Sequence, residues 1–208
     1  MNSLEMNNIE EIKTLNPYQQ EAVLDESPAC LVNANVGSGK TTVLIEKVRH
    51  LHEKKQVSYE KMAVLTFTNK AAGELKERLR NMLGGEEGDE VFASTFHSAC
   101  VRILRRWAES IGYPRSFTIY DTDDSQRVMK AVYKELSIDD KFFPIKSAIN
   151  QMSRWKDQLV SPEEALRTPA RDTKGAIAAK VYAAYEKKLR EAGAFDFDDL
   201  IYQTVQLL

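Results

Sequence analysis

A glycine-rich stretch, LVNANVGSGKTT, occupies residues 31–42 and constrains the fold more than any other part of the chain. The apolar run ACLVN (29–33) comes before the glycines, and apolar residues at helical spacing follow them over residues 41–54. A strand, a glycine loop and a helix in this order are typical of a phosphate-binding loop, because glycines let backbone N–H groups approach phosphate oxygens. The alternative is a glycine turn ahead of a surface helix, and the flanking elements disfavour it. We therefore expect a nucleotide site.

Within this loop, we expect particular side chains to have particular tasks. Lys40 is expected to reach the outer phosphates, and the Thr41 hydroxyl to join a Mg²⁺ shell; both are catalytic candidates, and Thr41 is the metal candidate. Ala34 stands where the usual pattern has its first glycine. This replacement is expected to cost little phosphate binding, because Gly37, Gly39 and Lys40 are in place. The candidate ATP-binding residues of the loop are Ala34, Asn35, Val36, Gly37, Ser38, Gly39, Lys40, Thr41 and Thr42.

Helices and strands alternate in the first part of the chain. Asn16, Pro17 and Gln19 predict a helix start with a cap, a proline and a capping-box partner, and the helix is expected to run to about Leu24. Strands are expected at 61–67 and 91–94, each followed by a helix, at 69–83 and 95–110. This alternation predicts an α/β fold with a parallel sheet.

The stretch after Gly112 is predominantly helical. It offers one short strand candidate, FTIY (117–120), and four expected helices at 123–136, 144–159, 161–168 and 173–193. We expect a helical insertion, with the chain re-entering the first domain near Phe195. The expected segments are a first domain at 1–112, the insertion at 113–192 and the return at 193–208.

Polar and aromatic residues follow two of the expected strands, where ligands gather in open α/β sheets. Phe beside Thr, Asn and Lys offers a stacking face plus phosphate donors, which suits single-stranded nucleic acid. The alternative is that Phe67 is ordinary core; His97, without partners for a nucleophile triad or a metal site, is interpreted as a hydrogen-bonding or stacking group. The candidate DNA-binding residues are Thr66, Phe67, Thr68, Asn69, Lys70, Thr95, Phe96 and His97.

Two acidic stretches imitate the carboxylates that an ATPase needs for Mg²⁺ and water. Asp121 to Asp124 are better explained as the cap and first turn of the next helix. In FDFDDL (195–200), Asp196 fits an N-cap with Asp199 as its capping-box partner, and Phe195 fits a hydrophobic staple on Leu200. Neither stretch is a convincing catalytic acid.

Composition restricts the remaining possibilities. The formal charge is -2 and 43% of the residues are hydrophobic, so a globular fold is expected and nucleic-acid binding must be local. Cys30 and Cys100 lack the spacing of a zinc site or a disulfide framework, so both are expected to be small buried residues. No apolar run could cross a membrane and the acidic start is no secretory signal, so we expect a cytoplasmic protein.

Together these segments resemble superfamily 1 DNA helicases of the UvrD/PcrA/Rep type. LNPYQQEAV resembles the adenine-reading motif and NVGSGKT the phosphate loop of that family. LTFTNKAA and STFHS resemble two of its DNA-contacting motifs, and FDFDDL resembles the segment after its helical insertion. The resemblance covers nearly the whole chain and implies an incomplete RecA-like P-loop NTPase sheet with a helical insertion subdomain.

The resemblance also implies an ATP-driven, Mg²⁺-dependent motor that moves 3′ to 5′ on single-stranded DNA and separates the duplex at single-strand/duplex junctions. Gln19 would then read adenine. In the family, the acidic motif for Mg²⁺ and water follows the FDFDDL segment, and arginines come from a second RecA-like domain. We therefore expect weak nucleotide binding, inefficient hydrolysis and reliance on C-terminal helicase domains of the same polypeptide. Asn35, Val36 and Thr42 depart from the family pattern, which leaves the loop conformation open.

Two functions from other classes remain open. One is a small, complete P-loop nucleotide or phosphate transferase that uses Asp121 or Asp198 as its acid. The other is a nucleic-acid-binding module with an idle loop, in which substitution of Lys40 would change nothing. Repair, plasmid replication and restart are equally open as pathways.

Overall fold

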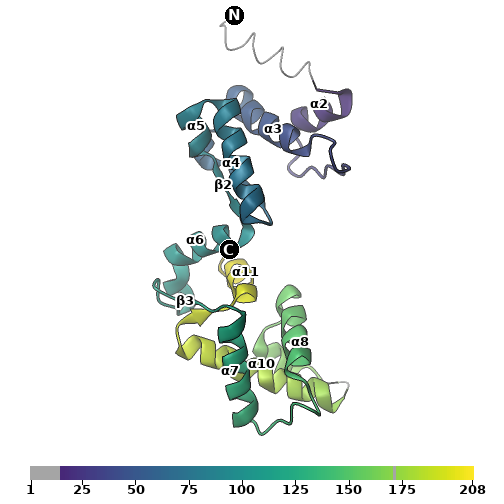
Figure 1. Ribbon diagram of the computed structural model, residues 1–208, viewed down its shortest axis with the longest axis vertical. Coiled ribbons are helices and arrows are strands. Elements are labelled where there is room, and N and C mark those ends of the chain that lie inside the picture. The colour runs from purple at the N-terminus through teal and green to yellow at the C-terminus, as the bar shows by residue number, and fades with distance from the viewer. Residues whose placement is uncertain (1–14, 171) are drawn as a thin grey trace, which may run out of the picture. The chain divides into compact units, whose positions relative to one another are not determined.

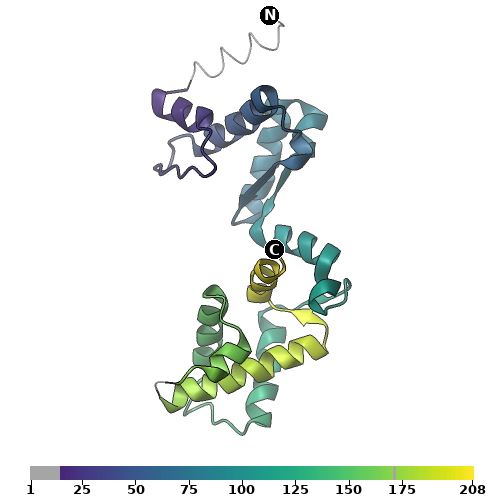
Figure 2. The same cartoon turned by 180° about the vertical axis from the view of Figure 1, so that it is seen from behind.

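A computed structural model of the chain describes residues 15–170 and 172–208. These residues form two compact units, which meet in the sequence between Thr95 and Phe96. Each unit has hydrophobic core clusters of its own. Figure 1 labels the elements along the chain, and Figure 2 shows them from behind.

The described part of the first unit combines helices with a two-stranded parallel sheet. Strands β1 (Ala63–Thr66) and β2 (Phe92–Thr95) pair with Ala63 opposite Phe92 and Thr66 opposite Thr95. The helices are α2 (Pro17–Leu24), α3 (Lys40–Lys55), α4 (Asn69–Leu83) and α5 (Gly85–Glu90), with a short 3-10 helix η1 (Tyr59–Lys61). A core cluster joins α3, η1, α4 and the two strands, and it includes Ile45, Val64, Leu75, Leu79 and Ala93.

The helix starts predicted in this unit are confirmed. The Asn16 side chain accepts from the Gln19 N–H at 2.9 Å, and the Asn16 N–H donates to Gln19 Oε1 at 2.9 Å, which completes the capping box of α2. The Thr68 hydroxyl accepts from the Ala71 N–H at 3.1 Å and caps α4. Helix α4 ends at Gly84, where a φ of 90° favours glycine.

Helix α5 was not expected from the sequence, because GEEGDE has no apolar periodicity. It packs on α4 at very close range. A Cβ at Gly88 would lie 2.6 Å from the Arg80 Cα and from the Leu79 carbonyl oxygen. The tertiary contact, made possible by a bare glycine, therefore outweighs the weak helix propensity of this segment.

The prediction of a strand at ACLVN (29–33) is wrong. Residues 29–33 adopt no regular structure, and the Leu31 side chain is 96% exposed. A strand needs a hydrogen-bonding neighbour, and in the described part of the chain β1 and β2 pair only with each other. Cys30 is consequently exposed, so its predicted burial is also wrong, whereas Cys100 is partly buried against the core of the second unit.

The second unit is mainly helical. Its elements are α6 (Phe96–Trp107), η2 (Ala108–Ile111), β3 (Thr118–Ile119), α7 (Thr122–Glu135), α8 (Ile145–Asp157), α9 (Pro162–Arg167), α10 (Thr173–Glu191), β4 (Ala194–Phe195) and α11 (Phe197–Leu207). The four helices predicted between residues 113 and 192 are thereby confirmed as α7 to α10. Strand β3 pairs in parallel with β4, so the chain returns beside β3 directly after α10.

Helix α10 is the centre of the larger core of this unit. It contacts α7, α8 and α9, which surround it in Figure 2. Its alanine-rich face buries Ala178 and Ala179 beside Tyr182 and Tyr185. Small residues let the neighbouring helices approach closely, while the two tyrosines fill the remaining volume.

The acidic stretches of this unit are helix starts, as predicted. Asp121 accepts from the Asp124 N–H at 2.9 Å and caps α7. Asp196 accepts from the Asp199 N–H at 2.8 Å, and Asp199 accepts from the Asp196 N–H at 3.2 Å, which forms the capping box of α11. Phe195 and Leu200 are both buried in one core cluster, as the predicted staple requires.

The two short parallel sheets among many helices agree with an α/β fold. A RecA-like sheet and the domain limits 1–112 and 113–192 stay predictions.

In the second unit, α11 follows β4 and packs on α6. None of the helices described for this chain is both long and apolar enough to span a membrane.

Candidate functional site

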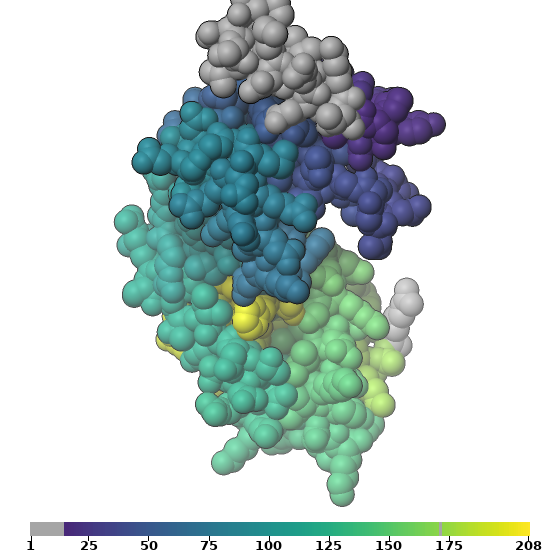
Figure 3. Space-filling model, turned by 45° about the horizontal axis from the view of Figure 1, so that its top comes forward, coloured from purple at the N-terminus to yellow at the C-terminus, as the bar shows by residue number. Residues whose placement is uncertain are grey.

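The glycine loop borders the candidate site, a cavity of about 690 Å³ in the first unit. Figure 3 shows this part of the chain in dark blue, at the right of the view. The cavity is lined by α2, the loop and the first turns of α3, through Asn16, Tyr18, Gln19, Ala22, Cys30, Val32, Asn33, Ala34, Asn35, Ser38, Lys40, Val43, Leu44 and Lys47. Its size suits a nucleotide-sized ligand.

Two glycines give the loop its shape. Gly37 and Gly39 both have a φ of 81°, a left-handed conformation that L side chains adopt rarely. Gly39 is the N-cap of α3, so the loop leads directly into the positive end of a 16-residue helix. The predicted sequence of glycine loop and helix is therefore present, although no strand precedes it among the described residues.

Lys40 is folded over the loop. Its Nζ donates to the carbonyl oxygens of Ala34 at 3.0 Å and of Asn35 at 2.7 Å. The Ser38 hydroxyl donates to the same Asn35 carbonyl at 2.7 Å. The lysine is thus held by neutral acceptors, which the more strongly attracting oxygens of a phosphate can replace.

The other predicted loop residues border this arrangement. Val36 is fully exposed, and Thr41 and Thr42 are half-buried in the first turn of α3. Gln19 reaches the loop from α2 and donates from Nε2 to the Ser38 carbonyl oxygen at 2.9 Å. The structure therefore brings the predicted base-reading residue into direct contact with the predicted phosphate loop.

The described lining of the cavity is positively charged. It contains Lys40 and Lys47 and no carboxylate. Lys47 donates to the carbonyl oxygens of Val23 and Asp25 at the end of α2. A hydrogen bond from Cys30 holds the pKa of the Asp25 carboxyl at about 2 and raises the pKa of the Cys30 thiol. This lining fits an anion such as a polyphosphate.

The predicted DNA-binding residues of the first unit follow paired strand ends. Thr66 and Thr95 lie opposite each other at the ends of β1 and β2, and Thr95 is buried. Directly after β1, the Phe67 ring is 87% exposed. The Thr68 hydroxyl serves as the cap of α4, and the two following residues, Asn69 and Lys70, are exposed in its first turn. Phe67 is therefore a surface ring and no core residue.

In the second unit, the start of α6 presents two rings. Phe96 is 40% exposed. His97 lies edge-on to Phe197, with ring centroids 5.8 Å apart. This contact is edge-on and lies within the unit, so the role of His97 as a hydrogen-bonding or stacking group for nucleic acid stays a prediction.

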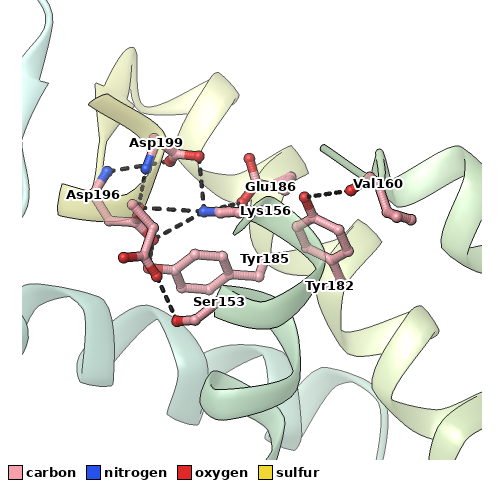
Figure 4. Close-up of polar contacts among 9 residues, drawn as sticks. Ser153, Lys156, Val160, Tyr182, Tyr185, Glu186, Asp196 and Asp199 are labelled. Atoms are coloured by element: carbon pink, nitrogen blue, oxygen red, sulfur yellow. Dashed lines mark hydrogen bonds and ion pairs between the residues drawn. The ribbon is translucent and has the colours of Figure 1, made fainter. Parts of the chain in front are cut away.

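Sequence reasoning missed a buried charge cluster in the second unit, which Figure 4 shows. Lys156 of α8 is 3% exposed, and its Nζ lies 2.8 Å from Glu186 Oε1 and 2.7 Å from Asp199 Oδ1. It also donates to both oxygens of Asp196 at 3.2 Å. The Tyr185 hydroxyl donates to Asp196 at 3.0 Å. We name these residues (Lys156, Tyr185, Glu186, Asp196 and Asp199) the Lys156 cluster.

Burial and charge act against each other in the Lys156 cluster. Burial lowers the pKa of Lys156, but the carboxylates of Asp199, Glu186 and Asp196 outweigh it and raise that pKa well above its ordinary value. Burial raises the pKa of Asp199 well above its ordinary value and raises that of Glu186 as well. Lys156 is therefore charged, and burial opposes the ionisation of Asp199 and Glu186. No short sequence pattern announces such a cluster, because its members come from distant elements.

Comparison with known proteins gives a consistent result. The UvrD/REP helicase N-terminal domain model matches residues 15–208. The chain is similar to ATP-dependent DNA helicase PcrA of Bacillus subtilis, with 44% identity over 193 residues, which cover 93% of this chain and 26% of that protein. It is also similar to PcrA of Staphylococcus epidermidis, at 43% over 94% of this chain and 27% of that protein.

A further relative is ATP-dependent DNA helicase UvrD1 of Mycobacterium leprae, with 41% identity over 93% of this chain and 25% of that protein. The chain spans about a quarter of the length of these relatives. The family match covers nearly the full sequence, including the glycine loop and both strand ends. The chain therefore belongs to the UvrD/REP helicase family and matches its N-terminal domain.

Proposed function

We propose that this chain is the N-terminal, ATP-binding portion of an ATP-dependent helicase that translocates 3′ to 5′ on single-stranded DNA and unwinds duplex. The observation that carries the proposal is Lys40, which is held over a loop with two left-handed glycines at the start of α3. The relatives of this chain are named ATP-dependent DNA helicases. The sheet would be RecA-like, with residues 113–192 as a helical insertion.

ATP would occupy the cavity beside the loop. Lys40 would exchange the carbonyls of Ala34 and Asn35 for phosphate oxygens, and the N–H groups at the start of α3 would donate to the same ligand. Gln19 would contact the base. A Mg²⁺ ion would neutralise phosphate charge, and the Thr41 hydroxyl is the residue of this chain proposed to hold it.

Hydrolysis by this chain alone is proposed to be slow. Phosphoryl transfer needs a carboxylate near Mg²⁺ and the attacking water, and the described lining of the cavity supplies none. The two acids considered as substitutes are engaged elsewhere, Asp121 as the cap of α7 and Asp198 with Ser153. Full activity would therefore depend on further helicase domains of the same polypeptide.

DNA would contact the strand-end residues, and the partner would be single-stranded DNA or a single-strand/duplex junction. The exposed ring of Phe67 supports stacking on a base. Phe96 and His97 are the corresponding candidates at the start of α6. Threonine, asparagine and lysine side chains next to them would donate to phosphates without reading sequence.

Thermal stabilisation by ATP and Mg²⁺ tests the nucleotide site. Binding to the folded state raises the unfolding temperature, and we expect Lys40→Ala to abolish most of this shift. Lys54→Ala is the matched control, because Lys54 is an exposed lysine near the other end of α3. An equal shift in wild type and Lys40→Ala would mean that the loop is idle.

A further inference from the structure

Gln19 uses both ends of its side-chain amide in this structure. Oε1 accepts from the Asn16 N–H at 2.9 Å, which belongs to the capping box of α2. Nε2 donates to the Ser38 carbonyl oxygen at 2.9 Å, across 19 residues of sequence. One side chain thus ties the start of α2 to the phosphate loop.

The backbone at Gly39 is shaped around this contact. A Cβ at position 39 would lie 2.8 Å from Gln19 Nε2, and the φ of 81° would strain any L side chain. Glycine at this position therefore serves two purposes. It permits the left-handed turn into α3, and it leaves room for the amide of Gln19 to reach Ser38.

The bond to Ser38 also sets the direction of a donor. The described chain has no cis peptide, and in a planar trans peptide the carbonyl and the following N–H point in opposite directions. Holding the Ser38 carbonyl toward Gln19 consequently turns the Gly39 N–H away from Gln19. This N–H stands at the start of α3, where backbone donors receive phosphate.

The other bonds of the loop connect the loop to itself. Ser38 N–H and the Ser38 hydroxyl donate to the Asn35 carbonyl at 3.3 and 2.7 Å. Lys40 Nζ donates to Ala34 and Asn35, and incoming phosphates would withdraw it from these carbonyls. The Gln19 bond lies outside that exchange, so it can persist when the ligand binds.

We propose that Gln19 is a positioning residue for the phosphate loop, whose amide holds the Ser38 carbonyl and thereby the Gly39 N–H in the orientation that receives phosphate. The inference rests on the proposed nucleotide binding and adds to the contact with adenine. Both tasks are compatible, because an amide has two N–H donors and two acceptor lone pairs, and one of each is free of the bonds above.

A ligand without a base separates the two tasks. Inorganic tripolyphosphate and ATP, each with Mg²⁺, are titrated by calorimetry into wild type and Gln19→Ala. Loss of one hydrogen bond is expected to weaken tripolyphosphate binding about 3- to 10-fold, and ATP binding at least as much. A residue that only reads the base would leave tripolyphosphate affinity unchanged, and that result would overturn the proposal.

Gln20→Ala is the matched control. It deletes the neighbouring amide, which donates to Leu15 within the same region and not to the loop, and Gln20 is not among the residues that line the cavity. It is expected to bind tripolyphosphate within about twofold of wild type. A loss in Gln20→Ala equal to that in Gln19→Ala would assign the effect to the start of α2 and contradict the positioning role.

Hydrogen exchange without ligand gives an independent readout. Amides of residues 35–40 are expected to exchange faster in Gln19→Ala than in Gln20→Ala, because the loop has lost its tie to α2. Equal exchange in the two variants would overturn the proposal. If wild type bound neither ligand, the proposed function would fail, and exchange of the loop would still decide the role of Gln19.

Discussion

At the scale of single residues, Lys156 joins separate elements of the second unit. Its ammonium is buried and lies within 3.2 Å of three carboxyl groups, which come from α10, the turn before α11 and α11 itself. A buried ion cluster stabilises a fold only as a complete set, because each partner offsets the desolvation of the others. Lys156 thus holds α8 to the start of α11.

Removing this ammonium is expected to destabilise the second unit. Lys156→Met leaves the buried Asp199 and the partly buried Glu186 and Asp196 without their cation, at a cost of about 3–5 kcal/mol in the free energy of unfolding. Both tryptophans, Trp107 and Trp155, belong to this unit, so tryptophan fluorescence during urea unfolding reports on it selectively.

Lys146→Met is the control for that substitution, since Lys146 is an exposed lysine of the same helix. It is expected to leave the urea midpoint within experimental scatter of wild type. Equal midpoints for the two variants would show that the Lys156 cluster contributes nothing net.

The raised pKa of the Asp199 carboxyl predicts that the stability of the second unit depends on pH. This pKa is raised by burial in the folded state, so the folded protein keeps a proton that the unfolded chain releases near its ordinary pKa of 3.8. The resulting stabilisation is complete below that value and is lost as pH rises through the folded pKa. As pH rises from 3.8 to the folded pKa of Asp199, the second unit is therefore expected to lose stability.

Asp199→Asn is expected to reduce this slope, because the amide does not ionise and can still accept from the Asp196 N–H. Some slope should remain, since burial also raises the pKa of Glu186. Asp157→Asn, which alters an exposed carboxylate of α8, should retain the wild-type slope. Urea unfolding at several pH values measures all three, and an unchanged slope in Asp199→Asn contradicts the assignment.

At the scale of elements, helices in this chain begin where a side chain satisfies the first backbone donors. Asn16, Thr68, Asp121 and Asp196 each accept from the N–H three residues later. These signals are local. The helices after Asn16, Thr68 and Asp121 were predicted to within a residue or two, and the helix start at Asp196 was predicted without an end. Helix α5 begins differently, after Gly84 and without a side-chain cap, and depends on its contact with α4.

Gly88→Ala tests that dependence. The added Cβ would meet the α4 backbone at 2.6 Å, so α5 must move, at a cost of about 1–3 kcal/mol. Gly85→Ala is the matched control, because a Cβ there meets nothing within 4 Å. Hydrogen exchange of α4 and β1 amides is expected to rise in Gly88→Ala alone. Similar exchange in both variants would mean that α5 is dispensable for the first unit.

At the scale of the whole molecule, two units with separate cores carry the proposed functions. The first contains the cavity proposed to hold nucleotide and Phe67, and the second contains the Lys156 cluster and the aromatic contact of His97. The chain is about a quarter of the length of its relatives. Binding measured on this chain therefore reports the share of nucleotide and DNA affinity that these two units supply.

We expect single-stranded DNA binding by the chain to be salt-sensitive and sequence-tolerant. Phe67→Ala should weaken it about fivefold or more through lost stacking, with little change in melting temperature because the ring is 87% exposed. Trp107→Ala removes an exposed ring at the end of α6 and serves as the control. Fluorescence anisotropy measures both; a large fall in melting temperature with normal DNA binding would mean that Phe67 is structural.

Much of the fold could be predicted because its signals are short. The capping boxes at Asn16 and Asp196 are bonds between residues three apart, so the sequence displays them directly. The paired strands β1 and β2 also appeared as compact apolar runs. The strand expected at 29–33 failed for the opposite reason: strand formation needs a partner, and apolar character alone does not supply one.

The sequence by itself determined the helix starts that have a side-chain cap, the glycine loop and the family, because each depends on neighbouring residues in a recognisable order. Only the tertiary structure decided which polar groups meet. Lys156 meets Asp196 across 40 residues and Gln19 meets Ser38 across 19, from elements whose packing brings them together. Burial then sets the energies of those contacts, since water that would screen charges or compete for hydrogen bonds is excluded only in the folded chain.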